Sequence, residues 1–96
     1  MQFELTGVLF ERFAQSGTEK YPKKEFIVEV AEQGQNGTTY SQFIRLQCSG
    51  KLLNVIDNYQ VGQRIKCQFN LKGNKWEKDG KRNYINSLDV WRIEKI

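Results

Sequence analysis

Short runs in which apolar and polar residues alternate follow one another along the chain, and clusters of Gly and Asn separate them. Alternation with a period of two is typical of strands that bury one face, and Gly-Asn clusters are typical of turns. The expected strands are residues 3–13, 25–31, 40–48, 64–71 and 83–93. The pattern therefore predicts a small all-β domain.

The first of these runs, residues 3–13, changes phase at Gly7. Apolar residues before Gly7 occupy odd positions, whereas Val8 and Phe10 after it continue in the other phase. A glycine within a strand pattern indicates a bulge or a sharp bend. We therefore expect this strand to bend at Gly7 and to serve two sides of a small barrel, and we expect residues 14–22 to form a loop.

The other runs divide their residues between an inner and an outer face because successive side chains of a strand point in opposite directions. The predicted inner residues are Phe26, Val28 and Val30, then Ile44, Leu46 and Cys48, then Ile65, Cys67, Phe69 and Leu71. The predicted outer residues are Glu25, Ile27 and Glu29 on the second strand, and Phe43, Arg45 and Gln47 on the third. The last run is apolar on both faces, which indicates burial on both sides or a bulge. Among the aromatic residues we expect Phe3, Phe10, Phe26, Phe69 and Trp91 in the core.

Between the third and fourth strands the period of apolar residues changes to that of a helix. Four apolar residues recur at spacings of three and four from Leu52 to Tyr59. Ser49 is suited to cap the N-terminus because its hydroxyl oxygen accepts a hydrogen bond from a free backbone N–H. We expect one helix of two to three turns, closed by the Val-Gly pair at residues 61–62.

The order of these elements, three strands, one short helix and two strands, is that of a five-stranded Greek-key OB barrel with its helix between strands three and four. The main alternative is a generic small β-sandwich, and a single helix at this place argues against it. With 96 residues the chain is expected to form one domain, residues 1–96.

The segment between the last two strands, residues 72–84, combines turn residues with positive charge. Asp79-Gly80 is a typical hairpin turn. Five Lys or Arg residues against two acidic ones give the segment a net charge of +3, whereas the whole chain has +4. Two interpretations of Trp76 remain open: its ring packs across the hairpin onto Tyr84, as cross-strand aromatic pairs do, or it contacts a ligand. The two are compatible, since such a pair also presents a stacking surface.

Composition narrows the chemistry that is open to this chain. It has two Cys and no His, and its pI is near 9.2. The absence of His excludes histidine-based catalysis, and without a Cys-x-x-Cys pair we expect no zinc site. Cys48 and Cys67 lie in apolar strands and are expected to be small buried core residues. No nucleophile, phosphate-cradling or acidic metal motif is visible, so we expect no enzyme activity, no metal and no cofactor.

Charge and location leave a nucleic-acid partner open. A mild excess of positive charge permits an anionic partner but does not require one. No apolar run is long enough to span a membrane, and the first residues lack the layout of a signal peptide. These features, with two unpaired Cys typical of a reducing compartment, predict a cytoplasmic protein.

The second half of the chain carries several short motifs in a fixed order. Gly50-Lys51 opens the helix, Val-Gly at residues 61–62 closes it, an alternating strand follows, and the next loop holds Trp76 and Asp79-Gly80. In this order they resemble bacterial single-stranded-DNA-binding proteins. The chain resembles still more closely a family of short bacterial OB-fold proteins of unassigned function. Those begin with Leu-Thr-Gly, here residues 5–7, and end with Trp-Arg-Ile-Glu, here residues 91–94.

Single-strand binding needs exposed rings on which bases stack and cations that follow the phosphates. In an OB fold the ligand crosses the second and third strands, and the loops joining strands one and two and strands four and five hold it. The predicted stacking residues are Trp76, Tyr84, Phe43 and Tyr21, and the predicted phosphate contacts are Lys72, Lys75, Lys78, Lys81, Arg82, Arg45, Lys23 and Lys24. Two carboxylates on the outer face of the second strand repel phosphate, so we expect the site nearer the third strand and the loops.

Two functional hypotheses follow. The first, which the resemblance implies, is non-sequence-specific binding of single-stranded nucleic acid, DNA in the first instance and otherwise RNA, in replication, repair or recombination. We expect a homodimer or higher homo-oligomer, because one barrel offers a short site and the proteins it resembles pair through their sheets. The second is an OB-like adaptor that binds a protein partner or itself through the second strand and the hairpin. Fold alone does not separate the two, because one barrel hosts many functions.

Overall fold

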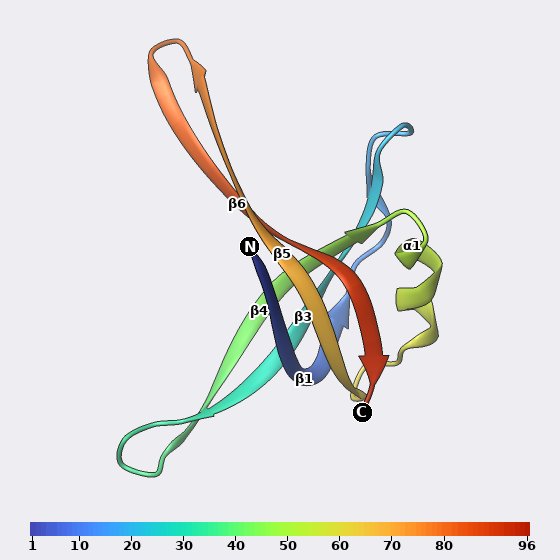
Figure 1. Ribbon diagram of the computed structural model, residues 1–96, viewed down its shortest axis with the longest axis vertical. Coiled ribbons are helices and arrows are strands. Elements are labelled where there is room, and N and C mark those ends of the chain that lie inside the picture. The colour runs from blue at the N-terminus through green and yellow to red at the C-terminus, as the bar shows by residue number, and fades with distance from the viewer.

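Five long strands form where the alternating runs predict them, and they close into a barrel with one short helical segment beside it (Figure 1). The computed structural model describes all residues, 1–96. The long strands are β1 (Gln2–Arg12), β3 (Pro22–Gln33), β4 (Thr39–Ser49), β5 (Arg64–Lys78) and β6 (Lys81–Lys95), and the helical segment comprises α1 (Leu52–Val55) and η1 (Ile56–Asn58). A two-residue strand, β2 (Ser16–Gly17), pairs with β3 inside the predicted loop.

The strand order is β1-β5-β6-β4-β3-β2, and β1 also pairs with β3, which closes the sheet into a barrel. The first half of β1 pairs with β5, and its second half pairs with β3. β4 and β6 meet through a single parallel pair, Gln47 with Asp89. The predicted five-stranded OB barrel, with its helix between the third and fourth long strands, is therefore confirmed. Closure excludes the open sandwich, because a sandwich leaves the first strand without this second partner.

Eleven buried apolar residues form one core. Every long strand contributes to it, and β3, β4 and β5 do so at alternate positions, as a barrel that buries one face requires. The core residues are Leu9, Phe26, Val28, Leu46, Cys48, Ile56, Ile65, Cys67, Phe69, Val90 and Ile93. The inner faces predicted for the second, third and fourth strands are confirmed. Three residues predicted to be core, Phe3, Phe10 and Trp91, are half exposed instead, and they lie on β1 and β6.

On β1 the structure corrects the predicted phase. Leu9 is fully buried, and the register shift lies between Leu9 and Glu11 instead of at Gly7. Gly7 is needed for a different reason: a β-carbon there would collide with the backbone carbonyl oxygen of Glu29 and approach Val28 Cγ1 to 2.7 Å. The glycine therefore allows β3 to cross β1 closely, and Phe10, predicted to be core, turns to the outside because it occupies the bulge.

Phe3 and Trp91 were also predicted to be core, and each is about half exposed. Phe3 lies near the start of β1, where it pairs with Phe69 and its ring stacks on the Phe69 ring with centroids 5.9 Å apart. Trp91 is the additional residue of a bulge, since Gln68 pairs with Arg92 while the next residue, Phe69, pairs with Val90. The extra residue explains why the last strand reads as apolar on both faces.

The helical segment begins later than predicted, and its second half, η1, is a 3-10 helix. Ser49 is the last residue of β4, paired with Lys23, and it does not cap the helix. The chain turns at Gly50, whose φ of +63° favours glycine, and α1 begins at Leu52. None of the helical segments is long and apolar enough to cross a membrane.

Candidate functional site

A cleft of about 480 Å³ lies where the base of the β5–β6 hairpin meets β3 and β4. We use the term β5–β6 hairpin for residues 72–87, which extend from the barrel as an arm (Figure 1). Outer side chains of β3 and β4 line one wall of the cleft, among them Lys23, Glu25, Arg45 and Gln47, and residues 85–88 line the other. The cleft therefore joins the predicted outer face of the second and third strands to the charged hairpin.

A second hollow, of about 410 Å³, continues the cleft toward the β1–β3 loop, residues 13–21. Lys23 and Gln47 line both, and Tyr21 and Lys20 lie at the far end of the second. The β5–β6 hairpin and the β1–β3 loop project from the same end of the barrel, which Figure 1 shows at the top. Together the two hollows form one groove that runs from the hairpin base to this loop.

One carboxylate lines the groove and a second lies beside it, and each faces cations. Glu25 lies 3.8 Å from Lys23 Nζ and 3.6 Å from Arg45 Nε. Asp89 borders a small hollow beside the cleft, accepts a hydrogen bond from Gln47 Nε2 at 2.6 Å and pairs with Lys72 Nζ at 3.0 Å. Three cations against two carboxylates leave a small positive excess here, and the cations are the more exposed partners.

The contacts of Asp89 also identify which face of the hairpin adjoins the groove. Because Gln47 and Lys72 both reach Asp89, these three side chains share the outer face. Directly paired residues and alternate residues share a face. The cleft face of the hairpin is therefore Lys72, Asn74, Trp76 and Lys78 on β5 with Lys81, Asn83, Ile85 and Ser87 on β6, and the reverse face is Gly73, Lys75 and Glu77 with Arg82, Tyr84 and Asn86.

This register contradicts the predicted packing of Trp76 onto Tyr84. Trp76 is directly opposite Asn83, and Tyr84 is opposite Lys75, so the two rings point to opposite faces. The turn itself is confirmed, because Asp79 and Gly80 both have positive φ, as a two-residue hairpin turn of type I′ requires. Trp76 remains 43% exposed on the cleft face and contacts no other aromatic ring closely enough to stack.

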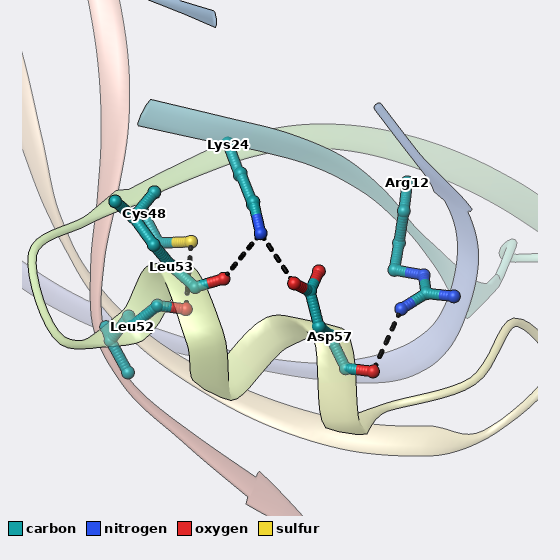
Figure 2. Close-up of polar contacts among 6 residues, drawn as sticks. All are labelled: Arg12, Lys24, Cys48, Leu52, Leu53 and Asp57. Atoms are coloured by element: carbon teal, nitrogen blue, oxygen red, sulfur yellow. Dashed lines mark hydrogen bonds and ion pairs between the residues drawn. The ribbon is translucent and has the colours of Figure 1, made fainter. Parts of the chain in front are cut away.

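Lys24, predicted to contact phosphates, instead binds the helical segment. Its Nζ lies 2.6 Å from Asp57 Oδ2 and donates to the backbone oxygen of Leu53 at 2.8 Å, as Figure 2 shows. Arg12 donates to the backbone oxygen of Asp57 in the same cluster. The Lys24 side chain is 16% exposed, against 41% for Lys23. Lys24 therefore ties the helical segment to β3 and does not reach the groove.

A group of exposed rings covers the outer face near the middle of β4. Phe10 meets Phe43 edge to face with centroids 4.9 Å apart, and the Arg45 guanidinium lies 5.4 Å from the centroid of the Phe13 ring. Phe43 was predicted to be exposed here, whereas Phe10 and Phe13 were not predicted to be part of a site. Phe13 follows the bulged end of β1, and no pattern in the neighbouring residues indicates which face its side chain occupies.

The two thiols offer no reactive group. Burial raises the pKa of Cys48 to about 11 and that of Cys67 to about 12, so both stay protonated near neutral pH. Both are free and buried, as predicted. The chain holds no group of three or more Cys, Asp or Glu side chains arranged as metal ligands.

The structure brings together most of the predicted contact residues but divides the hairpin. Lys23 and Arg45 line the groove, Tyr21 lies at its far end, and Phe43 lies on the outer face of β4. Lys72, Trp76, Lys78 and Lys81 lie on the cleft face of the hairpin, and Lys75, Arg82 and Tyr84 lie on the reverse face. Of the twelve, only Lys24 points into the barrel.

A family model described as "Domain of unknown function (DUF3127)" matches residues 4–94, nearly the whole chain. No curated protein matches the sequence. Solved structures share the fold at low sequence identity. The small single-stranded DNA-binding protein from Streptomyces coelicolor superposes with a TM-score of 0.68 at 15% identity, covering 100% of this chain and 94% of that one.

Two further structures extend the likeness. The protein PriB from Ralstonia solanacearum superposes with a TM-score of 0.71 at 17% identity, with 98% of this chain and 95% of that chain covered. A Plasmodium falciparum SSB in complex with single-stranded DNA superposes with a TM-score of 0.70 at 16% identity, over 93% and 84%. At these identities the likeness shows that all four chains have the OB fold.

Proposed function

We propose that this chain, which belongs to the DUF3127 family, binds single-stranded nucleic acid in the groove between the β5–β6 hairpin and the β1–β3 loop. The observation that carries the proposal is the shared face of Trp76, Lys78 and Lys81. An exposed ring and two unpaired cations stand together on the side of the hairpin that adjoins the groove. Stacking on rings and neutralisation of phosphates are the two interactions by which OB folds bind single strands.

The charges at the tip of the hairpin are a second argument for an anionic ligand. Lys78 and Lys81 are directly opposite one another, and like charges at paired positions destabilise a hairpin. The ion pairs of the hairpin are Lys72 with Asp89 and Arg82 with Glu77, so neither tip lysine forms an ion pair. A turn needs no such pair of cations, whereas a phosphate backbone that passes the tip would be bound by both.

In this proposal Trp76, Phe43 and Tyr21 stack bases, and Lys23, Arg45, Lys72, Lys78 and Lys81 contact phosphates. Phe10 and Phe13 join them, because they extend the exposed rings around Phe43. The Streptomyces coelicolor structure with this fold is a single-stranded DNA-binding protein by name, and the Plasmodium falciparum SSB is in complex with single-stranded DNA. DNA is therefore the first ligand to test. Stacking accepts every base, so we propose that no defined sequence is read.

Fluorescence anisotropy of a labelled, mixed-sequence single-stranded oligonucleotide tests the proposal. We expect binding at low salt that weakens steeply as salt rises. Trp76→Ala removes a stacking surface and should weaken binding by about 1–3 kcal/mol. Tyr84→Ala is the matched control, because Tyr84 is also an exposed ring, 69% against 43% for Trp76, and lies on the reverse face of the same hairpin. Absence of binding at low salt would contradict the proposal and favour a protein-binding adaptor.

We further propose that a second copy of the chain covers the outer face of β1, β5 and β6. A shallow hollow there is lined by Phe3, Gln68 and Trp91, and Gln68 Oε1 is the only buried side-chain oxygen or nitrogen in the chain without a hydrogen-bond partner. Half-exposed rings beside an unpaired acceptor fit a surface that is completed on association. Light scattering should show a dimer or higher oligomer, and Trp91→Glu should shift it to monomer. A monomeric wild-type chain would contradict this part of the proposal.

A further inference from the structure

The floor of the groove differs from its rim in charge, and this difference constrains how a strand would lie. The side chains of Glu25, which lines the groove, and of Asp89, which lies beside it, are 24% and 27% exposed, whereas those of Lys23, Arg45 and Lys72 are 41%, 66% and 58% exposed. Carboxylates at the floor repel phosphates, and cations at the rim attract them. A bound strand therefore has its phosphates along the rim and its bases directed inward.

At the floor, the Glu25 carboxylate and the Gln47 side-chain carbonyl oxygen can accept further hydrogen bonds. The nearest cationic nitrogens to the Glu25 carboxylate, at 3.6 and 3.8 Å, are beyond hydrogen-bonding distance, so its oxygens accept no strong hydrogen bond from the chain. Gln47 uses its amide N–H to donate to Asp89, which leaves its carbonyl oxygen as a further acceptor. Asp89 fixes this orientation, because a carboxylate needs a donor.

Bases differ in what they offer to such a floor. Cytosine, adenine and guanine carry exocyclic amino groups, which donate hydrogen bonds, and a carboxylate is a preferred acceptor for the cytosine amine. Thymine and uracil carry a carbonyl oxygen at the position of the cytosine amine, and a carboxylate repels it. Their single N–H lies between two carbonyl oxygens, which hinders its approach to a negative group.

From this arrangement we propose that Glu25, supported by Gln47 and Asp89, makes the groove prefer bases that carry an amino group over thymine and uracil. This inference rests on the proposed binding of single strands and deepens it. Stacking on the rings remains indifferent to sequence, and the floor adds a bias for one class of base. Glu25 is then a determinant of specificity as well as the ion-pair partner of Lys23 and Arg45.

Oligomers of deoxycytidine and deoxyuridine of equal length test the inference, because these bases differ only in the amino or carbonyl group at C4 and the proton at N3. Anisotropy titrations at slightly alkaline pH, where cytosine is neutral, should show the cytosine oligomer binding about tenfold more tightly, the effect of one hydrogen bond to a charged group. Glu25→Gln should bring the ratio of the two affinities close to one, since an amide both accepts and donates. Asp89→Asn should lower the ratio in the same direction.

Glu77→Gln is the matched control. It removes the same charge from the reverse face of the hairpin, so it should strengthen binding of both oligomers while the ratio stays at its wild-type value. Equal affinity of the wild-type chain for both oligomers would overturn the inference and leave the proposed function intact. The same holds for a ratio that survives both Glu25→Gln and Asp89→Asn. Binding of neither oligomer at low salt would instead refute the proposed function, and the inference with it.

Discussion

Lys23 and Lys24 follow one another on β3 and point to opposite faces of the sheet. Lys23 is paired with Ser49 on the outer face and lines the groove, whereas Lys24 is paired with Cys48 on the inner face. The inner face is otherwise apolar, so Lys24 extends past the core to donate to the backbone carbonyl oxygen of Leu53 and to the Asp57 carboxylate in the helical segment. A lysine near the end of a short helix stabilises it by donating a hydrogen bond to a backbone carbonyl oxygen that has no partner within the helix.

Substitution of each lysine by Met should separate stability from binding. Lys24→Met removes two hydrogen bonds at a largely buried position, and we expect it to lower the free energy of unfolding by about 1–2 kcal/mol. Lys23→Met should leave stability within about 0.5 kcal/mol and weaken nucleic-acid binding instead. Urea unfolding and anisotropy titration of both variants measure this. If Lys23→Met lowered stability and Lys24→Met weakened binding instead, the nucleic acid would be assigned to the wrong face of β3.

The two buried thiols make stability depend on alkaline pH. The pKa of each is raised from 9.0, to about 11 for Cys48 and about 12 for Cys67, because burial disfavours the thiolate. Above pH 9 the unfolded chain therefore holds fewer protons than the folded chain, and the free energy of unfolding falls as pH rises toward 11 to 12. Each thiol contributes a slope of up to about 1.4 kcal/mol per pH unit.

Urea unfolding between about pH 8 and pH 11 measures this slope. Tyrosines and lysines titrate in the same range, so the informative quantity is the difference between the wild-type chain and Cys67→Ala. The variant is expected to be less stable at all pH values, because it leaves a cavity, but to lose stability less steeply above pH 9. Equal slopes for both chains would contradict a buried, protonated Cys67.

At the residue scale, the alternation of apolar and polar residues correctly predicted which face a residue occupies in regularly paired strands. It gave the wrong face where a bulge interrupts the pairing. The outer position of Phe43 and the inner position of Phe26 follow from a period of two in uninterrupted strands. Phe10 and Trp91 lie at bulges, where one additional residue reverses the phase, and no local pattern marks which residue is added. Lys24 occupies an inner position of its strand, two residues before Phe26, and only its charge indicated an outer position.

At the scale of elements, β1 depends on Gly7. The sequence pattern indicated a bend there, whereas the structure requires glycine because β3 crosses closely. Gly7→Ala would place a methyl group against the Glu29 backbone and 2.7 Å from Val28 Cγ1, and neither atom belongs to a flexible side-chain end. We expect a loss of about 3 kcal/mol or more, because a rigid crossing of two strands must open. Thermal or urea unfolding measures it.

Gly73→Ala is the comparison for this substitution. Gly73 also lies within a strand, but its β-carbon would meet only the side-chain oxygen of Asn86, at 3.3 Å. That side chain can rotate, so we expect a change within about 1 kcal/mol, with a small gain from the reduced freedom of the unfolded chain. Similar losses at both positions would show that Gly7 matters only for its flexibility.

The lengths of elements were less predictable than their kinds. The fourth and fifth strands were expected to end at residue 71 and begin near residue 83, but their pairing continues to Lys78 and Lys81. Polar residues carry no alternation that reveals a strand exposed on both faces. The helix was predicted from its spacing, yet β4 extends through Ser49 because the pairing with β3 continues, and only the chain reversal at Gly50 allows the helix to begin.

At the scale of the whole molecule, the arms dominate the shape. The radius of gyration is 15.1 Å, whereas a compact chain of this length has about 12.5 Å. The β5–β6 hairpin and the β3–β4 hairpin extend beyond the barrel in Figure 1 and account for the excess. Residues 72–84 hold +3 of the chain's net charge of +4, so most of the excess positive charge lies on an arm that extends from the barrel.

This distribution predicts how binding depends on salt. Five cations lie on the proposed path, and each phosphate neutralised on a single strand adds about −0.7 to the slope of log K against log salt. The slope is thus expected to reach about −3.5 at most, and to be shallower where Glu25 and Asp89 already neutralise cations. Replacing Lys78 and Lys81 together by Gln should reduce the slope by about 1.4 units, because neither has an internal partner.

The matched variant replaces Lys75 and Arg82 by Gln. It removes two charges at the same part of the arm, but from the reverse face. If charge acted only through the general field of the hairpin, the two double variants would change the slope equally. Direct contact on the cleft face requires a clearly larger change for Lys78 and Lys81, because bound counterions are released only where a phosphate replaces them. Equal changes would therefore leave the charged arm as an attractor of nucleic acid while contradicting the path that Trp76 marks.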